Sequence, residues 1–401
     1  MRSRLRHFVV LCCLALSACS QHPGSTALPP ISAAFSRESV AAPDAGIFNA
    51  LYPFGKNAND GSQPTFLVPF NGVLYGTTTN GGASGEGIVF SVTPAGKEKI
   101  LHTFAVTDGA EPVGPLYNVG GLFFGTTISG GGPGSLGEVF TIDPGNGNFN
   151  VLYRFQGGPS DGIQPYGGLV GLNGKLYGTT SGGGANGEGT VYSITTGGVE
   201  QVIHSFSLAT NDGAQPMSTL IVVNGALYGT TLGGGRFGGG TIFRVSTGGN
   251  VRIVHSFGKG KDGSIPYFGA LIALNDTLYG TTLQGGDKGV GTVFSSGLTG
   301  PETVLYSFGG TAAKGCEPWA GLVNLNGTLY GTSVGGSTAP CLGEGTLFSV
   351  NPGGGATTIH KFAGGRGGNA PVGLAPMGAA LYGVTTGGGL FNQGLFYTVT
   401  P

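Results

Sequence analysis

Residues 176–180 read L-Y-G-T-T, and closely related versions of this phrase recur along the chain. The glycine of the phrase stands at Gly76, Gly125, Gly178, Gly229, Gly280, Gly331 and Gly383, with a spacing of 49 to 53 residues. Periods of this size are typical of repeat architectures, in which each unit buries its apolar surface against its neighbours. The sequence therefore predicts a tandem array of seven units.

Each unit contains four short apolar segments with the alternation typical of β-strands, and none has a helical period. We call these segments strands A to D. In the third unit they are expected near residues 168–172, at 175–180, at 189–195 and at 200–206. Asn173-Gly174, between A and B, is a strong hairpin signal. Four antiparallel strands in a repeat of this length are typical of one β-propeller blade.

The two ends of the repeat region are out of phase in an informative way. The last unit stops after strand C, at 395–400, whereas the region opens at 47–54 with IFNALYPF, which has the pattern of a strand D. Pairing these two segments would complete the seventh blade and remove exposed sheet edges. We therefore predict an all-β, seven-bladed propeller over 47–401, closed by strand 47–54 pairing with strand 395–400.

Antiparallel connection fixes where the loops lie. The D–A and B–C loops should share one face of the ring, here called the loop face, and the A–B and C–D turns should share the other. Cys316, in a D–A loop, and Cys341, in a B–C loop of the same blade, then lie close together. In an exported protein such a pair is expected to form a disulfide; the alternative is two free buried thiols.

The N-terminus has the features of an export signal. Three arginines precede an apolar run at 8–16, and Leu16-Ser17-Ala18-Cys19 resembles a bacterial lipobox. We expect residues 1–18 to be a lipoprotein signal peptide and Cys19 to carry the lipid. Residues 19–46 would be a flexible tether. The predicted location is the outer membrane or cell surface, with Cys19 as the only contact with the bilayer. An ordinary secretory signal is the alternative.

The repeated motifs point to a family. The patterns F-x(n)-D-G-x-x-P, N-G-x-L-Y-G-T-T-x-x-G-G and G-T-V-F-S-V-T resemble those of the GloVer (choice-of-anchor) tandem-repeat family of bacterial envelope proteins. The resemblance implies a propeller-like fold, export and anchoring. It implies no established activity and no catalytic residues.

Charge and histidine content exclude several functions. Charged residues make up 9% of the chain and the net charge is −1, which disfavours nucleic acid as a partner. The histidines of the repeat region share one position, two residues before the phenylalanine of strand D: His102, His204, His255 and His360. Because these histidines should be spread around the outer rim, we expect them to pack against side chains of adjacent strands. A histidine-dependent hydrolase or a metal centre built from these histidines is therefore disfavoured.

Acidic residues recur in the predicted loops. Aspartates precede glycine in the D–A loops, and glutamates are expected just before strand C: Asp60, Asp108, Asp161, Asp212 and Asp262, with Glu86, Glu138, Glu188 and Glu344. Turn capping is the local explanation. The loops of units one to three nevertheless hold seven acidic residues against one lysine, whereas later units balance five with six basic residues. This acidic arc would favour a cationic or Ca²⁺-bridged partner.

Three aromatic residues follow the proline of the D–A loop, namely Tyr166, Tyr267 and Trp319. Strand A is the innermost strand of a propeller blade, so these side chains should lie near the mouth of the central channel. There they could stack on sugar rings, or they could pack between blades. The glycine of L-Y-G-T-T is expected to admit an aromatic side chain from a neighbouring sheet.

We therefore expect an envelope-anchored binding scaffold, probing a glycan or a protein with its loop face, and acting as a monomer without a required cofactor. Two alternatives stay open. One is an extracytoplasmic enzyme acting on a polysaccharide or lactone, with Glu86, Glu138 or Glu188 as acid and base. The other is a purely structural surface component.

Overall fold

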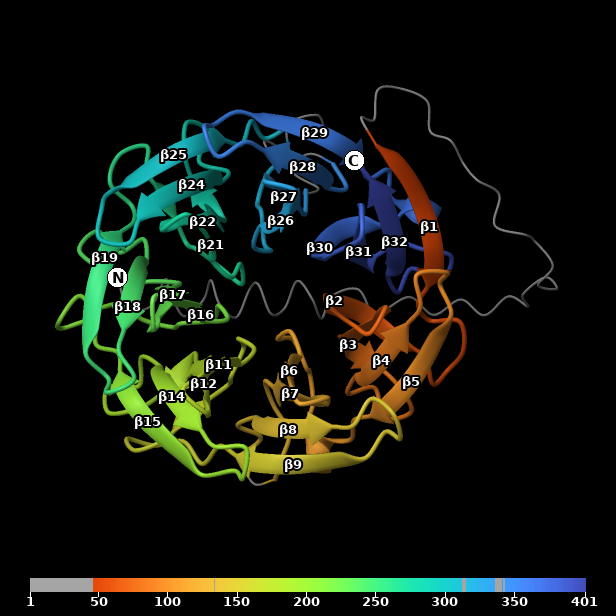
Figure 1. Cartoon of the computed structure of the whole chain (residues 1–401), viewed down its shortest axis with the longest axis horizontal. Coiled ribbons are helices and arrows are strands. Elements are labelled where there is room, and N and C mark those ends of the chain that lie inside the picture. The colour runs from red at the N-terminus through yellow and green to blue at the C-terminus, as the bar shows by residue number, and fades with distance from the viewer. Residues whose placement is uncertain (1–45, 133, 312–314, 336–340, 342) are drawn as a thin grey trace. The chain divides into compact units, whose positions relative to one another are not determined.

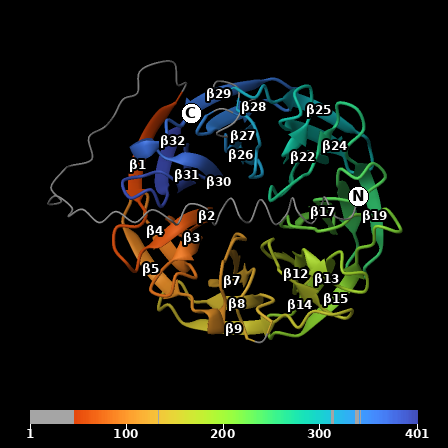
Figure 2. The ribbon, with the colours of Figure 1, turned by 180° about the vertical axis from the view of Figure 1, so that it is seen from behind.

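The computed structural model describes residues 46–401 except 133, 312–314, 336–340 and 342. The predicted signal peptide, Cys19 and residues 20–45 of the predicted tether lie outside this range. The described residues form seven four-stranded antiparallel sheets around a ring (Figures 1 and 2). Within them the only helical elements are two 3-10 turns, η1 (Val106–Asp108) and η2 (Gly365–Gly367). None of the described helices could cross a membrane. The predicted all-β, seven-bladed propeller is confirmed.

Blades 1 to 6 follow one another along the chain, each from its inner strand A to its outer strand D. Blade 1 comprises β2 (Gly61–Phe70), β3 (Val73–Gly81), β4 (Ile88–Val92) and β5 (Glu98–Thr103). Blade 2 comprises β6 (Tyr117–Val119), β7 (Leu122–Thr127), β8 (Glu138–Ile142) and β9 (Phe149–Arg154). Blade 3 comprises β11 (Val170–Leu172), β12 (Lys175–Thr180), β14 (Thr190–Ile194) and β15 (Glu200–Ser205). Blade 4 comprises β16 (Ile221–Val223), β17 (Ala226–Thr231), β18 (Thr241–Val245) and β19 (Val251–Ser256). Blade 5 comprises β21 (Ile272–Leu274), β22 (Thr277–Thr282), β24 (Thr292–Gly297) and β25 (Glu302–Ser307). Blade 6 comprises β26 (Val323–Leu325), β27 (Thr328–Ser333), β28 (Thr346–Val350) and β29 (Ala356–Lys361).

Blade 7 is built from both ends of the described chain. It contains β30 (Asn369–Met377), β31 (Ala380–Gly387), β32 (Leu395–Thr400) and, as its outer strand, β1 (Ile47–Pro53). β1 pairs with β32 in antiparallel register, with Ile47 opposite Thr400 and Pro53 opposite Leu395. Figure 1 shows β1 on the rim beside β32. The predicted closure of the ring is confirmed.

The A–B turns have the backbone that their sequence predicts. Asn173 and Gly174 both have positive φ, 52° and 77°, as a type I′ turn requires. Asn71-Gly72 repeats this geometry. The turn matches the right-handed twist of the flanking strands and so fixes their register.

The glycine of L-Y-G-T-T gives space to an aromatic ring of its own blade. Gly331 pairs directly with Phe348 on the adjacent strand C, and a Cβ on Gly331 would lie 2.6 Å from Phe348 Cζ. Gly280 has the same relation to Phe294. The sequence predicts a ring from a neighbouring sheet at this glycine, and that prediction is wrong, because the ring comes from strand C of the same sheet.

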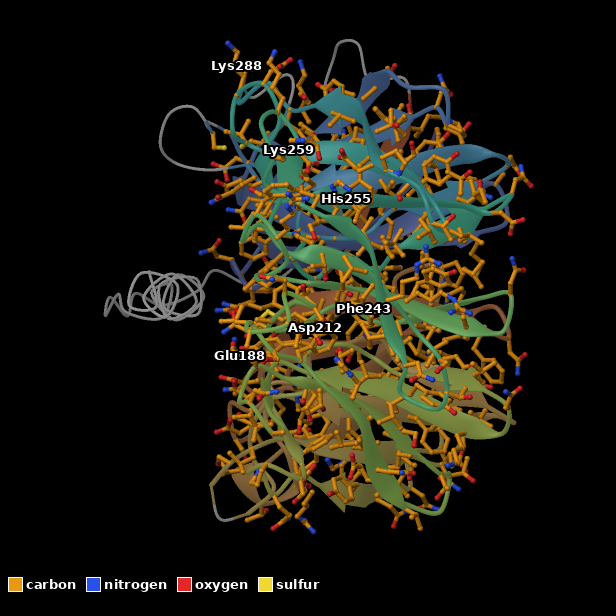
Figure 3. The ribbon with its side chains drawn as sticks, turned by 90° about the vertical axis from the view of Figure 1, so that its left-hand side faces the viewer. Glu188, Asp212, Phe243, His255, Lys259 and Lys288 are labelled. Carbon is orange, nitrogen blue, oxygen red and sulfur yellow. The ribbon has the colours of Figure 1, made fainter. Side chains whose placement is uncertain are left out.

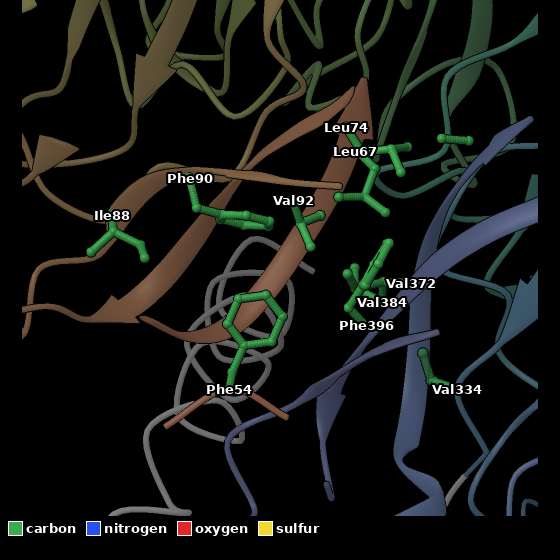
Figure 4. Close-up of a cluster of buried hydrophobic side chains, with 11 residues drawn as sticks. Phe54, Leu67, Leu74, Ile88, Phe90, Val92, Val334, Val372, Val384 and Phe396 are labelled. Carbon is green, nitrogen blue, oxygen red and sulfur yellow. The ribbon is translucent and has the colours of Figure 1, made fainter. Parts of the chain in front are cut away.

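These strand C rings also hold the blades together. The phenylalanine that ends each strand D packs edge-on against the strand C ring of the next blade, as in Phe206 with Phe243, whose centroids are 5.0 Å apart. The same contact occurs at all seven junctions. At the closing junction the pair is Phe54 and Phe90, in the apolar cluster between blades 7 and 1 (Figure 4). Edge-to-face pairs stabilise by about 0.5–1.5 kcal/mol beyond area burial.

The threonines of the repeated phrase make hydrogen bonds. The first threonine can reach the next blade: Thr179 Oγ1 donates to the Ser218 carbonyl at 3.1 Å. The second secures its own B–C loop, as when Thr180 Oγ1 donates to the Gly182 carbonyl at 2.9 Å. Packing and hydrogen bonding within the scaffold therefore account for the glycine and both threonines of the phrase.

Candidate functional site on the loop face

The D–A and B–C loops of each blade meet, as predicted. In blade 3, β10 (Gly162–Ile163) of the D–A loop pairs with β13 (Gly182–Gly183) of the B–C loop, and in blade 5, β20 (Gly263–Ser264) pairs with β23 (Gln284–Gly285). Figure 3 shows the loop residues Glu188, Lys259 and Lys288 toward the same side of the ring. The loop face is therefore one continuous surface built from two loops per blade.

A residue with strained backbone joins neighbouring blades on this face. It precedes the D–A proline in every blade and has φ between 49° and 58°: Gln63, Glu111, Gln164, Gln215, Ile265, Glu317 and Ala370. This left-handed region is uncommon for residues other than glycine. The amide of Glu111 donates to the Glu86 carbonyl of the preceding blade at 3.0 Å, and Gln215 does the same to Glu188. Sequence analysis missed this bridge, although the recurring G-x-x-P pattern was its signal.

The D–A aspartates have a structural role. Asp161 is buried, and its carboxylate accepts hydrogen bonds from the amides of Gln156 and Gly162. Asp60 is buried in the same way. The predicted turn-capping role is confirmed, and neither side chain lies on the exposed loop face. Asp108, whose side chain is 31% exposed, also caps a turn by accepting the Ala105 amide proton.

Each of these aspartates also binds the side chain found two residues before the strand D phenylalanine. Tyr153 Oη donates to Asp161 Oδ2 at 2.9 Å. His204 Nε2 lies 2.9 Å from Asp212 Oδ2, and His255 Nε2 lies 2.9 Å from Asp262 Oδ2. The histidines lie in different blades, as predicted. They do more than pack, because three of them hydrogen-bond or ion-pair with an aspartate.

At three junctions a half-buried glutamate, the first residue of strand D, joins this pair. These glutamates are Glu98, Glu200 and Glu302, in blades 1, 3 and 5. Burial and then the charge of Asp161 raise the pKa of Glu200 to about 7. Glu98 behaves alike beside Asp60, and burial together with Asp262 raises the pKa of Glu302 to about 9. Sequence analysis did not single out these residues, although their recurrence in every second unit was a signal.

Glu138 differs from its expected place. It is the first residue of β8, not a loop residue before it, and it is fully buried. Arg154 Nε lies 2.8 Å from Glu138 Oε1. Burial raises the pKa of Glu138 to about 7, while the Arg154 guanidinium acts in the opposite direction. Glu138 is therefore an internal ion-pair partner and is not presented to a ligand on the loop face.

The three predicted aromatic residues belong to a cluster of rings. Tyr267 and Trp319 have centroids 5.9 Å apart, and Tyr267 also contacts Phe268 at 3.9 Å. Phe268 in turn reaches Tyr166 of blade 3, with centroids 5.5 Å apart. Tyr166 and Tyr267 are each 8% exposed, whereas Trp319 and Phe268 are half-buried. Packing therefore accounts for most of the surface of both tyrosines, and Trp319 and Phe268 retain partly exposed rings.

Two carboxylates meet on the loop face where blades 1 and 2 join. Glu86 is half-buried and Glu111 is exposed. Although the Glu111 side chain as a whole is exposed, partial desolvation of its carboxyl group and the charge of Glu86 raise its pKa. Neither residue has an ion pair among the described residues. Glu188 and Glu344 lie at the equivalent position of other blades, half-buried and exposed, without such a partner pair.

The opposite part of the loop face carries positive charge. Around the exposed ring of Phe237 in blade 4, the Arg236 guanidinium and the Lys259 ammonium lie 5.4 and 5.9 Å from the ring centroid. Charge is therefore segregated on this face, as the uneven loop composition indicated.

Cys316 and Cys341 come together in blade 6. Both are buried in one apolar cluster, and both are free thiols in the structure. Burial, then a hydrogen bond with Cys341, raises the pKa of the Cys316 thiol. The predicted proximity is confirmed, and the disulfide stays a prediction.

Fold and loop geometry define the class as a seven-bladed β-propeller of tandem repeats with an asymmetric loop face. The family model of the Gloeobacter/Verrucomicrobia repeat matches residues 41–232 and 216–401. The chain belongs to this family, as the repeated motifs indicated. No curated protein sequence matches the chain.

Solved structures with similar folds include lyases. Virginiamycin B lyase from Staphylococcus aureus has a TM-score of 0.60 and 14% identity, over 88% of this chain and 99% of that chain. A streptogramin B lyase has the same score and identity, over 90% and 99%. A gluconolactonase from Xanthomonas campestris has a TM-score of 0.46 and 12% identity, over 88% and 97%. At 14% identity the likeness to the two lyases shows the fold alone.

Proposed function

We propose that the chain is an envelope-anchored recognition scaffold whose loop face binds a partner carrying cationic groups. The observation that supports this most directly is the Glu86–Glu111 pair. Both carboxylates reach the surface, and neither has an ion pair among the described residues. Two close like charges destabilise each other, so a cation brought between them is bound favourably.

A protein partner with lysine or arginine side chains fits this surface better than a neutral glycan. Sugar stacking needs exposed aromatic faces, and Tyr166 and Tyr267 are buried within their cluster. Arginine in particular matches carboxylates through paired hydrogen bonds. The partly exposed Trp319 ring leaves glycan binding as the other outcome of the test.

The enzymatic alternative has less support. It relied on Glu86, Glu138 and Glu188 as acid and base, and Glu138 is already paired with Arg154 inside the scaffold. Glu86 and Glu188 belong to blades 1 and 3 and come from different B–C loops. General acid–base catalysis needs both groups within hydrogen-bond reach of one substrate. Recognition requires no such convergence.

Anchoring through Cys19 is part of the proposal and rests on the lipobox resemblance. The chain should then partition into the outer-membrane fraction of cells, and Cys19→Ser should release it from that fraction. Retention of the Cys19→Ser chain in the outer-membrane fraction would contradict lipid anchoring.

Binding is tested with the purified chain against envelope proteins and glycans. The variant Glu86→Gln/Glu111→Gln removes both charges while keeping side-chain size. We expect its affinity for a partner captured by the unaltered chain to fall about tenfold or more, and wild-type binding to weaken as salt rises. Glu344→Gln, which removes an exposed charge at the equivalent position of blade 6, is the matched control and should bind normally.

Equal loss in both variants, or binding insensitive to salt, would contradict the proposed role of the acidic pair. Binding to glycans that is unaffected by Glu86→Gln/Glu111→Gln and lost in Trp319→Ala would instead assign recognition to the aromatic cluster.

A further inference from the structure

We propose that His255, Asp262 and Glu302 form a binding site for one divalent transition-metal ion of the Zn²⁺ class. The three residues come from β19, from the D–A loop leading into blade 5 and from β25, so the site joins blades 4 and 5 at their outer strands. It is separate from the Glu86–Glu111 pair and does not depend on the proposed recognition function.

The three side chains converge on one point. One imidazole nitrogen and one oxygen from each carboxylate lie within 4.8 Å of one another. Zinc–ligand bonds of about 2.0–2.1 Å place tetrahedral ligands about 3.3 Å apart, so only small side-chain movements are needed. Two carboxylate oxygens and one imidazole nitrogen are a donor set that Zn²⁺ and related ions accept, with water in the remaining position.

Unused ligand atoms point to a missing partner. The Asp262 side chain is 9% exposed, and its Oδ1 atom is buried without a hydrogen-bond partner. Glu302 Oε1 is also buried without a partner, as are Glu98 Oε1 and Glu200 Oε1 at the related junctions, so the unpaired oxygen that distinguishes this site is Asp262 Oδ1. At the related junctions the corresponding Asp60 and Asp161 Oδ1 atoms each accept an amide proton. Buried polar atoms are rarely left unpaired, and a bound cation would satisfy both oxygens.

The chain contains two natural variants of this arrangement. At the junction of blades 3 and 4, His204 and Asp212 are present, but Val251 stands where Glu302 stands at the proposed site. Elsewhere tyrosine replaces the histidine, as in Tyr153, Asp161 and Glu200. Of these related junctions, only that of blades 4 and 5 combines the imidazole with both carboxylates. The histidines of the repeat region lie in different blades, so none of them can share a metal with another, but one imidazole suffices when two carboxylates complete the set.

Metal binding changes the hydrogen bond between His255 and Asp262. Nε2 must present its lone pair to the ion, so its proton must be carried on Nδ1 instead. Each carboxylate binds in its charged form, and the proton that Glu302 holds in the metal-free fold is released to solvent. The ion then replaces the hydrogen bond as the link between blades 4 and 5.

The test is titration of the metal-free, purified chain with Zn²⁺, followed by calorimetry, and with Co²⁺, followed by visible absorption. We expect one ion per chain. Glu302→Val, which copies the natural Val251, and His255→Tyr, which copies Tyr153, should each weaken binding by about 100-fold or more. Val251→Glu should create a second site with His204 and Asp212 and raise the stoichiometry to two.

Thermal unfolding without metal checks that each variant folds, and added Zn²⁺ should raise the Tm of the unaltered chain but not that of Glu302→Val. Binding that persists in Glu302→Val and His255→Tyr would overturn the proposal and assign the ion to other groups, such as the thiols of Cys316 and Cys341. Failure of the unaltered chain to bind Zn²⁺ more tightly than Glu302→Val would overturn it as well.

Discussion

Single residues in this protein are constrained by their direct cross-strand neighbours. Gly331 illustrates this, because the ring of Phe348 lies against the face where a side chain would project. In the tyrosine–aspartate and histidine–aspartate pairs, one aspartate has two structural roles. It caps its own loop, and its side chain also contacts the tyrosine or histidine of the neighbouring strand D. Aspartates whose two carboxylate oxygens are both held in this way, such as Asp60 and Asp161, are poor candidates for ligand binding even though they recur in a loop.

Replacing Gly331 by alanine should destabilise the fold by about 1–3 kcal/mol, because the new methyl group displaces the Phe348 ring. Urea unfolding measures the change. Gly353→Ala is the matched control, because Gly353 lies in a turn with open space around its Cβ position. Equal effects of the two substitutions would contradict the assigned role of Gly331.

The thiols of Cys316 and Cys341 should oxidise to a disulfide when the chain is exported. Closing this loop should stabilise the fold by about 3 kcal/mol. The exported protein should be lighter by two hydrogens in intact mass, and reductant should lower its Tm. Cys316→Ala should be insensitive to reductant. An exported chain with two free thiols would contradict this prediction.

At the scale of elements, strands were predictable wherever their packing follows the alternation of apolar and polar residues along the sequence. The strand at 175–180 has the predicted bounds, whereas strand A of blade 3 begins at Val170, not near Gly168. The amide of Gly168 donates a hydrogen bond to Thr219 Oγ1 of the next blade, at 2.8 Å, instead of pairing within its own sheet. Such a contact depends on tertiary structure and leaves no periodic signal.

The misplacement of Glu138 has a similar cause. The segment between the last threonine of strand B and the valine of strand C is one residue longer in blade 2, from Thr127 to Val139, than in blade 3, from Thr180 to Val191. Matching the letters E and G between units therefore placed Glu138 outside its strand. The glutamates of strand D were missed because their aspartate partners belong to another part of the sequence.

The junctions built around Glu98 and Glu200 should make stability depend on pH. The pKa of each is about 7 in the fold against 4.5 ordinarily, so between these values the folded chain binds more protons than the unfolded chain. Their contribution is therefore present at about pH 4.5 and is lost as pH rises to about 7. Facing groups are Tyr52, Asp60 and Lys56 at Glu98, and Tyr153 and Asp161 at Glu200.

Glu98→Gln/Glu200→Gln should flatten this dependence, because an amide keeps the neutral form at every pH. The measurement is the urea midpoint at pH 5 and pH 8, where the unaltered chain should lose more stability than the double variant. Glu344→Gln, which changes an exposed carboxylate, should leave the pH dependence unchanged. A double variant with the same pH dependence as the unaltered chain would show that these carboxyls do not titrate as described.

At the scale of the whole molecule, seven similar junctions between blades stabilise the ring. Each has an edge-on aromatic pair, and the closing junction uses Phe54 and Phe90. The number of blades and the closure of the ring were predictable from the number and phase of the sequence repeats alone. The distribution of charge over the loop face was visible in the sequence, but the pairing of Glu86 with Glu111 depends on how blades 1 and 2 meet.

Truncation of the strand D phenylalanine should therefore cost the same at the closing junction as elsewhere. We expect Phe54→Ala and Phe206→Ala each to destabilise the fold by about 3–5 kcal/mol, since both rings are fully buried. Chemical denaturation measures both. A much smaller loss for Phe54→Ala would mean that the closing blade contributes little to the stability of the ring.

The pairing of β1 with β32 has a consequence for biosynthesis. β1 is the first described strand to leave the ribosome, and β32 is the last, so the earliest segment must wait unpaired until translation has finished. A prematurely terminated chain would expose an unsatisfied outer strand to proteases and chaperones. Ring completion thus couples the survival of each molecule to its full-length synthesis.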